Sequence, residues 1–309
     1  MIYFIIILAA IVLLILTASL VIFFKIFYSP KRKPVGPDEY VTPHGRIYEP
    51  YREQMIEWMK EMRSTEHRDV EITSYDGLRL VGKYYEQKKG APIEIMFHGY
   101  KSTAERDLCG GMQRCFRVGR NALIVEQRAC GASEGHVITF GAKESRDCLS
   151  WIDFVIKNID ENAEIIITGI SMGAATVMTA SSMNLPKNVV GVLADCGFTS
   201  TKDIVKKVME HRGLPADVLY PFARLGAIIF GGFDPDKRSP LKSMKECKLP
   251  IIFFHGDTDE YVPCYMSEEN YNACVSEKKR LVVTKGAGHG LCFIVDMDGY
   301  FRELDEFFK

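Results

Sequence analysis

The stretch that decides the fold is Thr168-Gly169-Ile170-Ser171-Met172-Gly173-Ala174-Ala175, which follows the apolar run at residues 164–167. The β-branched run before it is typical of a buried strand, and the small residues after it are typical of a packed helix. Glycines two positions before and after Ser171 allow the backbone to reverse tightly, as in a Gly-x-Ser-x-Gly turn that holds a strained serine. We therefore take Ser171 as the candidate nucleophile; the alternative is a tight turn with an inert serine.

Short apolar segments alternate with helical segments on both sides of this turn. Strands are expected at residues 92–97, 122–126, 164–168, 189–194, 250–254 and 280–284, and helices at 50–62, 104–118, 142–158, 171–182 and 297–308. The Asp76-Gly77 turn joins residues 69–73 to 78–85 as an antiparallel hairpin at one edge. Because apolar strands separated by helices form a parallel sheet covered on both faces, the sequence predicts an α/β fold whose eight-stranded sheet is mostly parallel.

One interval interrupts this alternation. Residues 199–248 have a helical composition but include several prolines and the pair Gly231-Gly232, and they are too many for one crossover helix. We interpret the interval as a helical lid insertion over the strand ends; an additional packing layer that touches no ligand is the alternative. The apolar residues of this interval are Leu214, Leu219, Phe222, Leu225, Ile228, Ile229 and Phe230.

The N-terminal segment is uncharged and almost wholly apolar from Met1 to Phe24. As a helix it would be about 35 Å long, which is sufficient to cross the hydrocarbon core of a bilayer. A cleavable signal peptide remains the alternative, although no basic region precedes the apolar run. Residues 1–27 are therefore predicted to be a transmembrane anchor, residues 28–49 a linker rich in proline, and residues 50–309 one α/β domain.

Positive charge on the far side of this anchor sets the expected orientation. Lys25, Lys31, Arg32 and Lys33 follow the apolar run, and the positive-inside rule places such a flank in the cytoplasm. We expect a single-pass membrane protein whose domain faces the cytoplasm. Reporter fusions at the C terminus that are active only outside the cell would overturn this orientation.

Composition excludes several classes of partner and cofactor. The 39 Lys and Arg residues nearly balance the 40 Asp and Glu residues, and neither sign forms long tracts, so no nucleic-acid partner is expected. The nine cysteines form no C-x-x-C pair, and an odd number cannot pair fully within one chain. We expect free, mostly buried thiols. Since no ligand cluster and no phosphate-cradling loop is present, no metal and no cofactor are expected.

Chemically useful side chains follow several of the expected parallel strands. Function gathers at the carboxyl ends of parallel strands, and a serine hydroxyl needs a base within hydrogen-bond reach. His289 follows the last strand in a glycine-rich loop and is the candidate base; a structural loop histidine is the alternative. His98 and His255 directly follow apolar strands and precede glycine, so we interpret both as buried structural residues.

The base requires a carboxylate on its other ring nitrogen, and two candidates follow the strand at residues 250–254. We favour Asp259, which lies further along the turn, and expect Asp257 to brace that turn. The oxyanion formed by attack of Ser171 needs backbone donors, for which we select the N–H groups of Met172 and Tyr100. The predicted catalytic residues are thus Ser171, Asp259 and His289.

The chain resembles the α/β-hydrolase superfamily from about Val70 to the C terminus. The resemblance is closest to bacterial, N-terminally membrane-anchored serine hydrolases related to the serine aminopeptidase-like and prolyl-oligopeptidase-like hydrolases. It is carried by residues 74–78, 98–100, 131–135, 169–175, 194–197, 255–263 and 286–289. The family pattern places the nucleophile at Ser171, the acid at Asp259 and the base at His289, and it implies an α/β-hydrolase fold.

Two departures from the family pattern border the expected site. The segment at residues 126–131 resembles the family's Asp-x-Arg-Gly-x-Gly, but it carries Glu126 for the aspartate and Ala129 for a glycine. Family membership leaves the acyl group open, since esterases, lipases, thioesterases and peptidases share this frame.

We expect a membrane-anchored serine hydrolase that cleaves a carboxylic ester through an acyl-enzyme on Ser171, with a small-molecule or lipid-like acyl substrate. A serine peptidase acting on a peptide, or a thioesterase, is the first alternative. A hydrolase fold that serves as a catalytically idle, membrane-tethered binding module is an alternative of another class.

Overall fold

The computed structural model describes residues 1–31, 33 and 35–309, so the expected roles of Arg32 and Pro34 lie outside the described residues. Its centre is one eight-stranded sheet with the order β1-β2-β4-β3-β5-β6-β7-β8. The strands are β1 (Arg68–Thr73), β2 (Arg79–Tyr85), β3 (Ile93–Phe97), β4 (Asn121–Val125), β5 (Ile165–Ile170), β6 (Val189–Asp195), β7 (Ile251–Gly256) and β8 (Lys279–Thr284). The hairpin β1–β2 is antiparallel and lies at one edge, and β3 to β8 pair in parallel.

Helices cover both faces of this sheet, as alternating strand side chains require. Along β3, Ile93, Ile95 and Phe97 pack into one core, and Met96 packs into the other. The first face is covered by α4 (Glu144–Asn158), α5 (Met172–Ala180), α8 (Pro240–Met244) and α9 (Tyr265–Ala273), and the second by α2 (Arg52–Ser64), α3 (Ala104–Arg117), α10 (Cys292–Val295) and α11 (Met297–Phe307). The predicted α/β architecture with eight strands and a hairpin at the edge is confirmed.

Several element boundaries differ from those expected from the sequence. The strand expected at residues 164–168 continues to Ile170, and the helix expected at residues 171–182 runs from Met172 to Ala180. The helix expected at residues 50–62 is preceded by a 3₁₀ turn, η1 (Arg46–Tyr51). Such ends depend on tertiary contacts that propensity alone does not contain.

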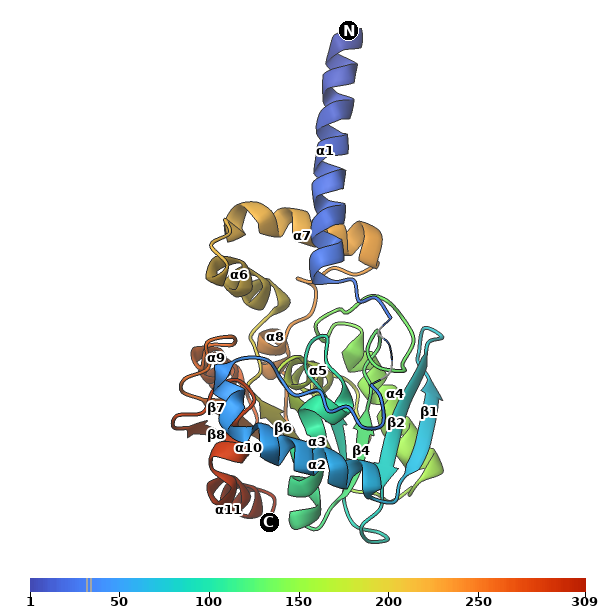
Figure 1. The fold of residues 1–309 in the computed structure, drawn as a ribbon. Helices are drawn as coiled ribbons and strands as arrows, with labels where there is room; N and C mark the ends of the chain where they lie inside the picture. Colours follow the sequence, from blue (N-terminus) through green and yellow to red (C-terminus); the bar gives the residue numbers. More distant parts are fainter. Residues whose placement is uncertain (32, 34) are drawn as a thin grey trace.

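The N-terminal helix α1 (Ile2–Ile26) leaves the domain as a long apolar rod, and the lid interval crosses its base (Figure 1). The helices of that interval on the α1 side of the domain are α6 (Thr201–His211) and α7 (Ala216–Gly231). Gly226 of α7 lies so close to α1 that a Cβ atom there would be 2.4 Å from the backbone oxygen of Ser19. Small residues permit this close backbone approach between two helices.

The last turn of α1 is part of the folded domain. Phe27 is fully buried, with its ring against Phe140 and Phe233. The next residues extend the contact, since Tyr28 forms an antiparallel bridge with Val137. The expected boundary at residue 27 therefore does not separate two independently packed parts of the chain.

Gly226→Ala should destabilise the full chain. Glycine to alanine within a helix ordinarily stabilises by about 1 kcal/mol, but overpacking of a close contact costs about 1–3 kcal/mol. We expect a lower unfolding temperature in detergent micelles, followed by circular dichroism. Val218→Ala on the same helix, where the side chain is 61% exposed, is the matched control and should leave that temperature nearly unchanged. An unchanged or raised unfolding temperature for Gly226→Ala would contradict the close packing of α1 on α7.

Candidate active site

The turn between β5 and α5 holds Ser171 in a strained conformation. Its φ and ψ are 55° and −115°, a region that side-chain-bearing residues rarely adopt. The turn can close because its two glycines lack side chains. A Cβ atom on Gly169 would be 2.1 Å from the backbone of Gly173, and one on Gly173 would be 1.9 Å from the backbone oxygen of Phe97. The structure thus places Ser171 at the carboxyl end of the sheet and at the N-terminus of α5.

The structure brings Ser171, His289 and Asp259 together from three separate loops. Ser171 Oγ lies 3.0 Å from His289 Nε2, and His289 Nδ1 lies 2.7 Å from Asp259 Oδ2. With its proton on Nδ1, the imidazole donates to the carboxylate and leaves Nε2 to accept from the serine hydroxyl. This is the geometry that general-base activation of a serine needs.

The hydrogen-bonded chain from Ser171 through His289 to Asp259, here called the relay, lies in surroundings that favour an ionised Asp259 and a basic His289. Burial alone would raise the pKa of Asp259, but hydrogen bonds from His255 and His289 hold that pKa well below its ordinary value. Burial alone would lower the pKa of His289, yet the hydrogen bond and charge of Asp259 raise that pKa above its ordinary 6.5. The carboxylate is thus ionised and stabilises the imidazolium that forms when Ser171 loses its proton.

The loop after β7 carries both Asp257 and Asp259, and the two carboxylates have different hydrogen-bond partners. Asp259 Oδ1 accepts hydrogen bonds from the backbone N–H groups of Tyr261 and Val262, each at 2.9 Å. Asp257 contacts a different group: its Oδ1 accepts from the backbone N–H of Gly286 at 2.6 Å. His255, fully buried, contacts the Val262 carbonyl at 2.7 Å through Nε2. Asp257 thus braces the loop that precedes His289, and His255 supports the loop that carries Asp259.

The loop after β3 lies beside the nucleophile and carries Tyr100. A Cβ atom on Gly99 would be 3.6 Å from Ser171 Cβ. His98 is buried behind it, where its Nε2 accepts from the backbone N–H of Gln127 at 3.0 Å. Met172 is the first residue of α5, and the first N–H groups of a helix have no partner within that helix. Tyr100 is the residue after Gly99, and Met172 directly follows Ser171, so the N–H groups of both remain the predicted oxyanion donors.

Two side chains that sequence reasoning did not select hold the site loops. Asp107 of α3 accepts from the backbone N–H of Gly99 at 2.9 Å, which positions the loop after β3. Tyr48 of η1 donates its hydroxyl to the backbone carbonyl of His289 at 2.9 Å. Part of the interval expected as a linker is therefore packed against the site. One indication of this packing is present in the sequence: Tyr48 is an aromatic residue within a segment rich in proline and glycine.

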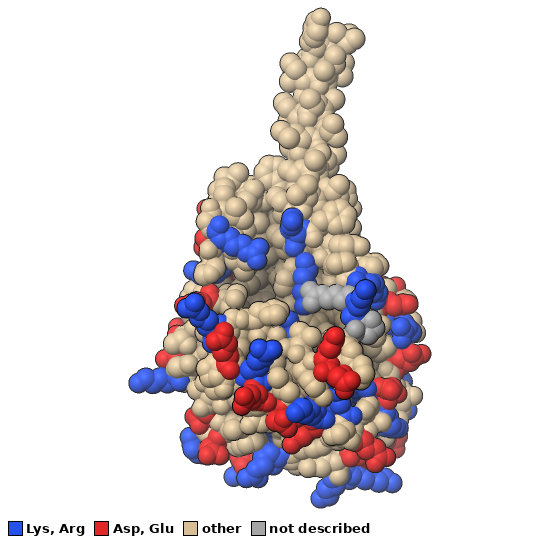
Figure 2. Space-filling model, viewed as in Figure 1, with Lys and Arg blue, Asp and Glu red and all other residues tan. Residues whose placement is uncertain are grey.

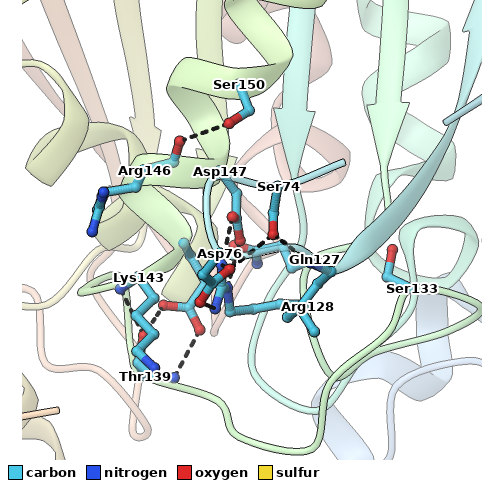
Figure 3. Close-up of polar contacts among 12 residues, drawn as sticks. Ser74, Asp76, Gln127, Arg128, Ser133, Thr139, Lys143, Arg146, Asp147 and Ser150 are labelled. Atoms are coloured by element: carbon cyan, nitrogen blue, oxygen red, sulfur yellow. Dashed lines mark hydrogen bonds and ion pairs between the residues drawn. The ribbon is translucent and has the colours of Figure 1, made fainter. Parts of the chain in front are cut away.

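The loop at residues 126–131 is organised by Arg128, which joins the β1–β2 turn to α4 (Figure 3). The guanidinium of Arg128 bonds Asp147 at 2.6 Å and Asp76 at 2.9 and 3.0 Å. Ala129 has φ 61°, which explains why a glycine suits the family pattern there. Glu126, the other departure, accepts from the backbone N–H of Ala104 at 3.1 Å and so caps α3. Both departures are accommodated without displacing Ser171 or His289.

One group of potential metal ligands occurs among the described residues, namely Cys196, Asp259 and His289, with ligand atoms within 4.8 Å of one another. Two of these side chains are already bonded to each other in the relay. Burial raises the pKa of the Cys196 thiol well above its ordinary value, so this sulfur stays protonated and is a poor ligand. The donor set fits the hydrogen-bonded relay better than it fits a metal.

Comparison with known proteins agrees with this fold. No protein-family model matches the sequence. The chain is 27% identical over 196 residues to the Bacillus subtilis protein YqkD, a match that spans 62% of each chain and so less than two thirds of the relative. It is 24% identical over 247 residues to protein bem46 of Schizosaccharomyces pombe, covering 78% of this chain and 76% of that protein. The structure of the Pyrococcus furiosus esterase Pf2001 superposes with a TM-score of 0.66 and 25% identity, over 90% of this chain and 98% of the esterase.

The chain is an α/β protein with a tight turn that holds a serine at the carboxyl edge of its sheet. Histidine and aspartate side chains lie within hydrogen-bond distance around this serine. The chain has the α/β-hydrolase fold, and the resemblance recognised in its motifs is confirmed at that level. Similarity to esterases supports hydrolase chemistry.

Arg128→Met should lower the free energy of unfolding by about 3–5 kcal/mol, because it leaves the buried carboxylate of Asp147 without its counter-charge. Denaturant unfolding of the full chain in detergent measures this loss. Arg146→Met, which removes an exposed arginine of the same α4 region, should cost far less. Equal losses in the two variants would show that the Arg128 bonds do not stabilise the loop.

Proposed function

We propose that this protein is a membrane-anchored serine hydrolase that cleaves carboxylic esters, with Ser171, His289 and Asp259 as its catalytic residues. The observation that carries the proposal is the continuous hydrogen-bonded relay from Ser171 Oγ through both ring nitrogens of His289 to Asp259. The name of the similar Pyrococcus furiosus protein, an esterase, supports an ester as the bond cleaved.

The reaction proceeds in two halves. Ser171 Oγ attacks the ester carbonyl while His289 Nε2 takes the hydroxyl proton, and the backbone N–H groups of Met172 and Tyr100 stabilise the oxyanion. Collapse breaks the bond to the leaving alcohol, whose oxygen receives the proton from His289, and an acyl-Ser171 ester remains. Water then loses a proton to His289 and attacks this ester; the bond from the acyl carbon to Ser171 Oγ breaks, His289 returns the proton to Oγ, and the carboxylic acid leaves.

The anchor is the second part of the proposal. Among the described residues, α1 is the one helix long and apolar enough to span a membrane. Phe23 of α1 and Phe27, the residue after its end, are buried against the domain, so removal of this segment by a signal peptidase would take away part of the packed core. We therefore favour a retained anchor, with Lys25 and the following basic residues placing the domain on the cytoplasmic side.

Ser171→Ala should abolish ester hydrolysis, with a loss of at least about 10³-fold, because no other side chain takes the place of the attacking oxygen. The full chain in detergent micelles is assayed with short-chain p-nitrophenyl esters and labelled with a fluorophosphonate probe. Ser182→Ala, a half-buried serine two residues beyond α5, is the control and should keep activity and labelling. Equal labelling of Ser171→Ala would rule out Ser171 as the nucleophile, and a wild type that is neither labelled nor active would favour an idle binding module.

Asp259→Asn should lower kcat by about 10³-fold or more with little loss of folding, whereas Asp257→Asn should have a mild effect. Only neutral His289 accepts the serine proton, so the rate of the wild type falls as the pH drops through the raised pKa of His289, above 6.5. Without the Asp259 charge this acid limb should move to lower pH. The pH profiles of kcat/KM for the wild type and both variants measure the shift. Comparable losses in kcat for the two variants would show that the division of roles between the aspartates is wrong.

A further inference from the structure

The outward face of helix α7 is an apolar stripe that is partly exposed to solvent. Val218, Phe222, Leu225 and Ile229 recur at steps of four, three and four residues, so they share one side of the helix. Val218 is 61% exposed and Ile229 49%, whereas Phe222 and Leu225 between them are half-buried. Ile228, which borders the stripe, is 44% exposed. A contiguous exposed apolar surface on a helix marks an interaction site.

The charged side chains of α7 are turned away from this stripe and are paired within the protein. Arg224 bonds the carboxylates of Asp234 and Asp236, and Asp217 pairs with Lys206 of α6. By helical spacing, Asp217 and Arg224 lie together on one flank of α7, next to the stripe and not within it. The stripe is therefore free of charge along its whole length.

The opposite face of α7 packs against α1, which fixes the depth at which the stripe lies. Ala223, Gly226 and Ala227 are buried there, and Gly226 contacts Ser19 of α1. The hydrocarbon core of a bilayer takes about 20 helical residues, so a core that begins at Ile2 ends near residue 21. The contact with α7 is at this same level, where hydrocarbon meets the lipid headgroups.

The surface around the base of α1 is mostly apolar, as a surface between lipid hydrocarbon and headgroups would be. Figure 2 shows the surface beside the base of α1 as mostly tan, with a few basic side chains on it, acidic atoms at its left edge, and mixed charges over the rest of the domain. Figure 1 shows α7 lying across the base of α1, as a helix in the plane of a membrane surface would lie. Lys25, at the end of α1, is exposed at this level. The apolar surface beside the base of α1 is continuous with the exposed apolar surface of α1.

We propose that the stripe of α7 inserts into the surface layer of the lipid bilayer that α1 spans, so that the lid is seated on the membrane and an amphiphilic ester reaches Ser171 from the bilayer. This inference rests on the proposed function for its substrate, and on the anchoring of α1 for its membrane. One apolar cluster connects the parts involved: it contains Phe23 of α1, Tyr220 and Ala223 of α7, and Met172 beside the nucleophile. The lid contact with lipid is thus joined to the site by direct packing.

Contact of the stripe with lipid is tested by tryptophan fluorescence. The full chain carrying Ile229→Trp is reconstituted in nanodiscs of phosphatidylcholine and phosphatidylglycerol, with and without brominated acyl chains. The native Trp58 and Trp151 are buried in the domain, so the added tryptophan dominates any lipid-dependent quenching. We expect quenching several-fold greater than for Lys157→Trp, an exposed position on α4. Equal quenching at both positions would overturn the contact.

Delivery of substrate from the bilayer is tested by placing negative charges in the apolar stripe of α7. Val218→Glu with Ile229→Glu should leave hydrolysis of a water-soluble short-chain ester unchanged and lower hydrolysis of a long-chain ester dissolved in the same nanodiscs at least about 10-fold. Lys157→Glu is the control and should change neither rate. Equal long-chain rates in wild type and the charged variant would overturn delivery from the bilayer. Quenching of Ile229→Trp without hydrolysis of either ester by the wild type would support the lipid contact and contradict the proposed ester chemistry.

Discussion

The contact on which the structure most depends is the approach of the α5 backbone to the end of β3. Gly173 packs against the carbonyl oxygen of Phe97 at a distance that admits no Cβ atom, and Gly169 of β5 packs equally closely against the backbone of Gly173. Because two peptide groups meet without side chains between them, the strand must reverse within a few residues, and Ser171 is forced to positive φ. Packing in the sheet supplies the free energy that holds this strained turn. The position of the serine, the first N–H groups of α5 and the neighbouring loop after β3 all follow from it.

A second level of organisation holds the loops that surround this turn. Asp107 fixes the loop after β3, His255 fixes the loop of Asp259, and Asp257 and Tyr48 fix the loop of His289. Each of these bonds joins a side chain to a backbone group, so each restrains the path of a loop. Loops that are restrained in this way keep side chains from different strands within hydrogen-bond distance, which an isolated flexible loop does not do.

The sheet and the candidate site were predictable because both leave local signals. Runs such as residues 164–167 signal a buried strand, and glycines around Ser171 and His289 signal tight backbone at the strand ends. The choice between Asp257 and Asp259 was harder, since both lie in one turn and only the folded geometry separates their contacts. Tyr48 and Asp107 were missed because their bonds join distant parts of the chain and have no spacing rule. The packing of Gly226 on Ser19 was missed for the same reason: a small residue in a helix looks the same whether or not another backbone lies against it.

The burial of Phe27 has a consequence for any truncated form of this chain. Its ring lies between Phe140 and Phe233, and the hydroxyl of Tyr100 bonds the carbonyl of Ile26. A chain that begins after residue 30 would lack this ring and would expose the small-residue face of α7 to water. About 1.5–3 kcal/mol of burial free energy is lost with one such aromatic side chain, before any rearrangement of α6 and α7. The C-terminal end of α1 and the residue that follows it are therefore structural elements of the domain, and deleting them removes a piece of the core.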